Sequence, residues 1–409
     1  MHVLPFSHRP TILKALAILT ITASNVVNSF HATARLNQSA GGEQAAGQSI
    51  CSETAPTAFK TSATRVTWLC NLPEIEKYAY PRVQFISDQE GWVCIGTKLW
   101  KAADSGATWQ CIFDGGVDKF GSANGIDDFQ FVSSDIGWVL SFEELRKTTD
   151  GGRTWRLLSN PLSDGWLRSF KFLEGGKVGW VGGGLYRDLG EDEETSNRFY
   201  AHDETHRGLF AAVFRTEDGG ETWRSQPISL SPGDIFDFYF LDQEHGWAFG
   251  QAGDFYLKDG QWRQGPSGAI DDRQDVDDQG SGPTCEEIEI GGPTYCPIAV
   301  WFVDNRVGWI SNWNGYVGKS TDGGVTWTDL VNLGAEDPND WLPPAIVSWY
   351  FLDASMAWGL DSHGDLRTTS DGGATWRRLD LNLGLTHMCL LDARHGWAVS
   401  KDALYRIAL

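Results

Sequence analysis

Two short phrases recur along the chain of 409 residues and restrict its fold more than any other feature. The first phrase is an apolar pair, then Ser, Asp or Glu, then three or four residues, then Gly-Trp. In the sixth copy Ala357 replaces the glycine. A unit that repeats about every 40–50 residues is typical of a β-propeller. The seven copies end at Trp92, Trp138, Trp180, Trp247, Trp309, Trp358 and Trp397.

The second phrase follows most copies of the first and reads Ser/Thr-x-Asp-Gly-Gly-x-Thr-Trp. Asp-Gly-Gly between two apolar strands predicts a hairpin turn, because glycine adopts positive φ angles and aspartate accepts bonds from nearby N–H groups. We interpret the turn aspartates as structural, because they lie on different repeats and cannot converge as a catalytic pair. They are Asp150, Asp218, Asp322 and Asp371, with a weaker copy at Asp104 and a degenerate one at Asp259.

The two ends of the repeat array predict how the ring closes. The seventh unit, from Leu385 to Leu409, has room for three strands and lacks the second phrase. Near the start, Thr67 to Cys70 matches Thr108 to Cys111, which begins a fourth strand. We therefore predict an all-β fold, a single seven-bladed propeller over residues 61–409. Its N-terminal strand would complete the last blade and remove the open edge.

The residues before the repeats predict export. Arg9 and Lys14 precede or open a short apolar run that ends near Ala32-Thr33-Ala34, which is typical of a signal peptide over residues 1–34. Residues 35–60 are predicted to be a flexible leader. The expected location is the periplasm, the extracellular space or the thylakoid lumen. Seven cysteines agree with an oxidising compartment, and Cys285 with Cys296 is the first disulfide candidate, the other pairings being open.

The charge of the chain limits its partners. The 33 basic and 54 acidic residues give a net charge of −21, which disfavours nucleic acid and anionic membrane surfaces. Two insertions, 186–208 and 266–296, hold seven and eight acids against three bases and one. A calcium loop is a candidate cofactor site in the second insertion, with a solvated acidic loop as the alternative. Its ligands would be Asp275, Asp277, Gln279 and Glu286.

With both phrases in seven units, the chain resembles the photosystem II assembly/stability factors, a family of propellers with BNR (Asp-box) repeats. The resemblance covers residues 61–409. It implies an exported, non-enzymatic protein that binds another protein and helps to assemble a membrane complex. In that family the partner is a reaction-centre precursor. Because a closed ring leaves no free strand edge, we expect a monomer.

Candidate binding residues follow from the propeller, which commonly binds ligands where its innermost strands begin. Mixed charges with aromatic side chains are typical of a surface for a peptide or a glycan. The alternative is that they are ordinary rim charges and packing between blades. Counted back from each apolar pair, these positions hold Arg82, Asp128, Arg168, Asp237, Ser348 and His387, with Lys171, Tyr239, Trp301, Trp349 and Tyr350 deeper on the same strands.

A carbohydrate-binding or glycoside-hydrolase propeller of the sialidase type is the alternative function. Asp127, Asp128 and Asp237 could supply the acid and the base of such a site, and no spacing in the sequence singles out a pair among them. Sialidases also need an arginine triad and an [FY]-R-I-P motif, and the nearest string, Tyr405 to Ala408, lacks the proline. The sequence therefore favours a binding protein over an enzyme.

Overall fold

The computed structural model describes residues 59–60, 65–72, 81–116, 125–188, 207–228, 233–250, 253–265, 297–312, 315–333, 344–379, 381–392 and 395–408. These residues form 29 β-strands and no α-helix, and none of their segments is a helix that could cross a membrane. The predicted signal peptide, nearly all of the leader, the calcium ligands and the pair Cys285 and Cys296 lie outside the described residues.

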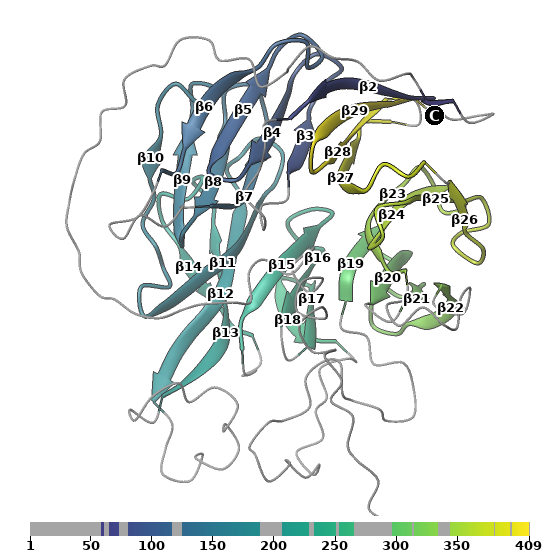
Figure 1. Ribbon diagram of the computed structural model, residues 1–409. Helices are drawn as coiled ribbons and strands as arrows, with labels where there is room; N and C mark the ends of the chain where they lie inside the picture. Colours follow the sequence, from purple (N-terminus) through teal and green to yellow (C-terminus); the bar gives the residue numbers. More distant parts are fainter. Residues whose placement is uncertain are drawn as a thin grey trace, which may run out of the picture.

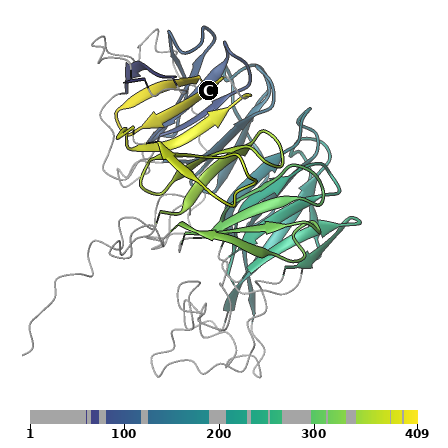
Figure 2. The same ribbon diagram turned by 90° about the vertical axis from the view of Figure 1, so that its right-hand side faces the viewer.

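The strands form seven antiparallel sheets that are the blades of a propeller, which confirms the predicted fold (Figure 1). The chain fills one blade after another around the ring, and the last blade returns to the first, as Figure 2 shows in yellow and blue. Blade 1 is β3 (Arg82–Phe85), β4 (Gly91–Ile95), β5 (Lys98–Ala102) and β6 (Gln110–Asp114). Blade 2 is β7 (Ile126–Phe131), β8 (Gly137–Ser141), β9 (Glu144–Thr148) and β10 (Arg156–Leu157).

The next four blades repeat this order from the innermost strand outward. Blade 3 is β11 (Gly165–Phe172), β12 (Gly179–Asp188), β13 (Arg207–Thr216) and β14 (Arg224–Gln226). Blade 4 is β15 (Ile235–Phe240), β16 (Gly246–Gly250), β17 (Gly253–Lys258) and β18 (Gln261–Gln264). Blade 5 is β19 (Pro297–Phe302), β20 (Gly308–Asn312), β21 (Tyr316–Ser320) and β22 (Thr328–Asn332). Blade 6 is β23 (Ile346–Phe351), β24 (Ala357–Asp361), β25 (Leu366–Thr369) and β26 (Arg377–Leu379).

Blade 7 joins the two ends of the chain, as the repeats predicted. Its inner strands are β27 (Leu385–Leu390), β28 (Gly396–Ser400) and β29 (Ala403–Ala408). The N-terminal strand β2 (Arg65–Asn71) pairs antiparallel with β29, with Val66 opposite Ile407, and lies beside it in Figure 1. A short strand, β1 (Phe59–Lys60), adds a fifth member at the outer edge and falls within the range predicted as leader.

The first phrase is explained by packing between neighbouring blades. Phe85 lies opposite Gly91, and a Cβ atom on that glycine would stand 2.4 Å from the Phe85 ring. In six of the seven phrases the tryptophan stacks on the phenylalanine of the next blade, and the exception is Trp358, because blade 7 has Leu390 at that position. Trp138 and Phe172, for example, have ring centroids 3.7 Å apart and planes 7° apart. A cation of the third strand, Lys147, covers the other side of Trp138 at 5.5 Å. Apolar burial and ring stacking therefore hold blade to blade.

The second phrase forms the turn between the third and fourth strands. In blade 2, Thr154 donates from its N and its Oγ1 to the Asp150 carboxylate at 2.9 and 2.6 Å. Gly152 N donates to Thr148 Oγ1 at 2.8 Å, and its φ is 90°, which favours glycine. The same bonds from threonine to aspartate recur at Asp104, Asp218, Asp322 and Asp371.

The ring has two faces that matter for the site. We call the face at which the innermost strands begin the proximal face, and the face at which they end the distal face. Strands β12 and β13 have ten residues each and extend past the other blades on the proximal side (Figure 1). The chain also leaves β18 at Gln264 and enters β19 at Pro297 on that side. Both acidic insertions are therefore attached to the proximal face.

Candidate functional site

The innermost strands place two layers of side chains along the axis of the ring. Both layers lie on the side of each sheet that faces the next blade. Each residue of the distal layer pairs with a Gly-Trp tryptophan; they are Gln84, Gln130, Lys171, Tyr239, Trp301, Tyr350 and Cys389. The proximal layer lies two residues earlier and consists of Arg82, Asp128, Ser169, Asp237, Ala299, Ser348 and His387.

The distance from the apolar pair decides which of the predicted residues join these layers, because Arg168 lies four residues before Phe172 and the other predicted entry residues lie three before their own apolar pair. Six innermost strands shift register at the same position, and in blade 3 the shift falls between Leu167 and Ser169. Arg168 occupies the bulge, so Ser169 takes the place in the proximal layer that we had predicted for Arg168. A bulge re-aims the side chain that it carries. Arg168 Nε lies 3.2 Å from Asp234 Oδ2, and the Asp234 side chain is buried.

Trp349 does not reach the axis either. It lies between Ser348 and Tyr350 on the strand, so its side chain points to the other side of the sheet. There it is 5% exposed and packs near Trp376 and Phe351. Trp349 is therefore part of the core between blades, which is the alternative that the sequence had left open for it.

Most of the distal layer connects one blade to the next. Gln130 Nε2 donates to Phe172 O and Phe172 N donates to Gln130 Oε1, both at 2.8 Å. Gln84 makes the same two bonds to Phe131. Tyr239 OH donates to Phe302 O at 2.9 Å, and Tyr350 OH donates to Leu391 O at 3.2 Å. These side chains satisfy backbone groups of the next blade, so their first role is structural.

Two members of the distal layer differ from this pattern. Lys171 is exposed, and no hydrogen bond or ion pair to it is found among the described residues. Trp301 has rings on both sides, with the Tyr239 centroid at 5.7 Å and the Tyr350 centroid at 5.1 Å. We call Tyr239, Trp301 and Tyr350 the aromatic arc. It runs along blades 4 to 6 and is half-buried, so its ring surfaces remain partly accessible.

Charged residues occupy the opposite part of the axis, on blades 1 to 4. Arg82 Nη1 lies 3.1 Å from Asp128 Oδ1 and also donates to Asp127 O. Asp237 is within electrostatic range of Lys171, Asp128 and Arg82. We call Arg82, Asp128, Lys171 and Asp237 the charged arc. The structure thus brings together four of the predicted residues, Arg82, Asp128, Lys171 and Asp237.

Two groups of the proximal layer have shifted pKa values. Loss of solvation raises the pKa of Asp237 to about 6, although the residue is still exposed on β15 and the positive charge of Lys171 opposes the change. Burial lowers the pKa of His387 to about 4, and the charge of Arg82 acts in the same direction. His387 Nδ1 accepts a bond from Val83 N at 3.4 Å, which fixes the ring against blade 1. At neutral pH His387 is therefore neutral and Asp237 is mostly ionised.

Two further acidic residues lie beside the charged arc on the proximal face: Asp127, which the sequence offered as a possible acid or base, and Glu143, which sequence reasoning missed. Asp127 Oδ2 accepts a bond from Phe142 N at 3.0 Å, at the tip of the hairpin between β8 and β9. Glu143 follows at the same tip, and burial raises its pKa, with the Asp127 charge adding to the effect. In the sequence, the consecutive aspartates Asp127 and Asp128 before the apolar pair of blade 2 are the one signal that points to an acidic cluster on the proximal face.

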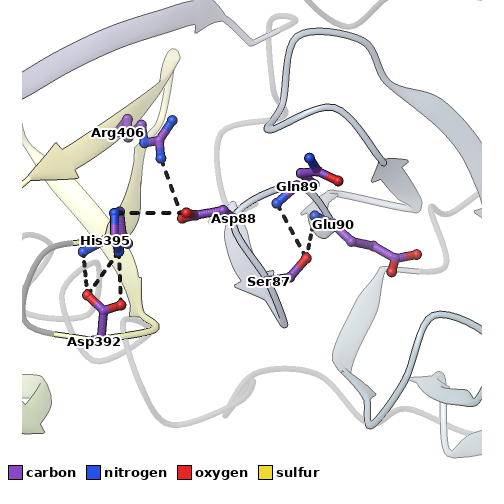
Figure 3. A network of polar contacts seen from close by, with 7 residues as sticks. All are labelled: Ser87, Asp88, Gln89, Glu90, Asp392, His395 and Arg406. Atoms are coloured by element: carbon purple, nitrogen blue, oxygen red, sulfur yellow. Dashed lines mark hydrogen bonds and ion pairs between the residues drawn. The ribbon is translucent and has the colours of Figure 1, made fainter.

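A second polar cluster lies on the distal face, where blade 7 meets blade 1 (Figure 3). His395 Nδ1 lies 2.9 Å from Asp392 Oδ2, and its Nε2 lies 3.8 Å from Asp88 Oδ2. Arg406 Nη2 lies 3.4 Å from Asp88 Oδ1. These groups satisfy one another across the closing junction, so the cluster supports ring closure more than it supports a ligand. In the part of the chain that the structure describes, no three His, Cys, Asp or Glu side chains could hold a metal ion together.

Comparisons with known proteins show the propeller fold. No family model and no curated protein matches the chain. A solved structure of YCF48 bound to a D1 peptide has a TM-score of 0.56 and 16% identity, and covers 86% of this chain and 99% of its own. YCF48 from Cyanidioschyzon merolae gives 0.54 and 16%, with 84% and 98% covered. A streptogramin B lyase gives 0.53 and 10%, with 85% and 98% covered. The same fold thus occurs in a peptide-bound protein and in an enzyme.

Proposed function

We propose that this protein is a binding propeller that holds a segment of another polypeptide at the proximal end of its axis. The observation that carries the proposal is the pairing of the charged arc with the aromatic arc. Lys171 offers an ammonium group without a protein partner among the described residues, and Asp237 offers a carboxylate. Tyr239, Trp301 and Tyr350 offer ring surfaces beside them. A polypeptide presents charged, amide and apolar groups that match such a surface.

The likeness in fold to YCF48 bound to a D1 peptide supports the proposal, because it is an example of a ring of this kind with a bound peptide. The export and the assembly or scaffold role predicted from the sequence, with a membrane-complex subunit as the partner, belong to the same proposal. On this view the ring acts by holding its partner and performs no reaction.

Selection of peptides tests the proposal directly. A random peptide library displayed on phage is panned on the full-length protein, and enriched peptides are then measured against Lys171→Glu and Asp237→Asn. We expect enrichment on the wild type and at least about tenfold weaker binding to Lys171→Glu. Lys177→Glu is the matched control, because Lys177 is an exposed lysine in the turn on the distal side of the same blade. Absence of enrichment, or equal loss in the control, would refute the proposal.

One observation favours the glycoside hydrolase as a second candidate. Asp237 has a pKa raised to about 6 by loss of solvation, and Asp128 contributes to that rise as a nearby negative charge. A carboxylic acid with a raised pKa near a second carboxylate is one arrangement that an acid and base pair can use. A panel of aryl glycosides decides the matter: turnover that disappears in both Asp128→Asn and Asp237→Asn would establish the enzyme.

A further inference from the structure

The hairpin between β8 and β9 has an unusual tip. Phe142 and Glu143 have φ angles of 49° and 64°, a conformation that side chains other than Gly, Asn and Asp rarely adopt. The equivalent hairpin of blade 1 places Gly96, with a φ of 58°, at its positive-φ position. Glycine or asparagine at this tip would therefore give a more stable turn than phenylalanine does.

Phe142 is also the most exposed large apolar side chain among the described residues, at 69%. The tip lies on the proximal face, because β8 ends there and β9 begins there. Its position is fixed by the bond from Phe142 N to Asp127 Oδ2. Asp127 in turn accepts a bond from Arg82 through its backbone oxygen. The exposed ring is thus held next to the charged arc.

Strain of this kind persists where the surrounding structure enforces it, and it concentrates at binding sites. The side chain of Phe142 contributes little to the core, so its burial does not explain why the residue occupies this tip. Contact with a bound partner would explain it, because an aromatic ring that becomes buried on binding is a typical source of affinity.

The charges around the tip indicate the chemistry of that partner. Five acidic residues, Asp127, Asp128, Glu143, Asp234 and Asp237, interact with one another and with three basic residues, Arg82, Arg168 and Lys171. The acidic insertions, which hold 15 acids and four bases, are attached to the same face. An excess of negative charge attracts a basic segment and repels an acidic one.

We infer that Phe142 is a binding residue of the proximal face, and that it contacts an apolar side chain of a polypeptide segment that also carries lysine or arginine. This inference rests on the proposed function and specifies the class of its partner. The Phe142 ring covers the apolar residue, while the neighbouring carboxylates pair with the basic residue.

The test uses the peptides enriched from the phage library on the full-length protein. Phe142→Asn suits the positive φ and removes the ring, so we expect binding about tenfold weaker together with an unchanged or higher melting temperature. Phe142→Tyr keeps the ring and should retain binding. Leu157→Asn is the control, because Leu157 is 51% exposed on the outermost strand of the same blade and should leave binding unchanged.

The outcomes separate the two proposals. Basic, apolar peptides that bind Phe142→Asn as tightly as the wild type, but lose affinity for Asp237→Asn, would overturn the role of Phe142 and leave the proposed function intact. Enrichment of acidic peptides would overturn the partner class. No enrichment at all would overturn the proposed function and this inference together. A fall in melting temperature for Phe142→Asn, with unchanged binding, would show that the ring is structural.

Discussion

The bonds that Gln130 makes between blades 2 and 3 give a stability prediction that can be worked from the structure. Gln130→Leu removes both bonds to Phe172 and places an apolar side chain against its N–H and C=O groups. An unsatisfied buried backbone group costs about 1–3 kcal/mol. Two such groups give about 2–6 kcal/mol. Because Gln130 is half-buried and water reaches it from the axis, we expect a loss near the lower end, about 2–3 kcal/mol.

Denaturation in guanidinium chloride, followed by tryptophan fluorescence, measures this loss as a lower midpoint. Gln226→Leu is the control: Gln226 lies on the outermost strand of blade 3, and its bonds to Arg224 O and Ser225 O are both 3.4 Å long. We expect the control to change the free energy of unfolding by less than about 0.5 kcal/mol. If the two variants lose the same stability, the bonds between blades do not hold the ring together in the way argued.

Three further predictions concern pH. Asp237 has a folded pKa of about 6, above its ordinary value of 3.8, so its contribution to the free energy of unfolding falls as pH rises from about 4 to 6. Thermal melting across this range should show that the Asp237→Asn variant lacks this fall. His387 has a folded pKa of about 4, below 6.5, so its contribution rises over pH 4 to 6.5, and calorimetry should find that rise absent in His387→Gln. The bonds from Thr154 lower the pKa of Asp150 to about 2, so the contribution of Asp150 to the free energy of unfolding is lost as pH falls from 4 to 2. Denaturation followed by circular dichroism should show that Asp150→Ala is less stable than the wild type at pH 7 by about 1 kcal/mol. The stability of this variant should also depend less on pH below 4.

The repeats carried enough information to predict the fold. Each phrase encodes one local requirement, such as the close approach of Phe85 to Gly91 or the positive φ of Gly152. Because that requirement recurs in every blade, the number of blades and the closing strand followed from counting. Single departures such as Ala357 did not disturb the pattern.

The site was only partly predictable. The bulge recurs in six blades, and the spacing seen at Asp128 and Asp237, three residues before the phenylalanine, gives Ser169 in blade 3, so Arg168 could have been excluded by a stricter count. The alternation that buries Trp349 could have been read from its neighbours once the position of Tyr350 was known. The role of Phe142 depends on its φ angle and on its bond to Asp127, which sequence patterns do not reveal.

The pairing of β2 with β29 has a practical consequence for experiments on this ring. Arg65 lies opposite Ala408, and Phe59 lies opposite Val66, so both ends of the described ring are at the distal face. A tag or linker that follows the C-terminal end of β29 therefore leaves from the side away from Phe142 and the charged arc. Protein immobilised through its C-terminus should present its proximal face to the solution, which is the orientation that a binding assay needs.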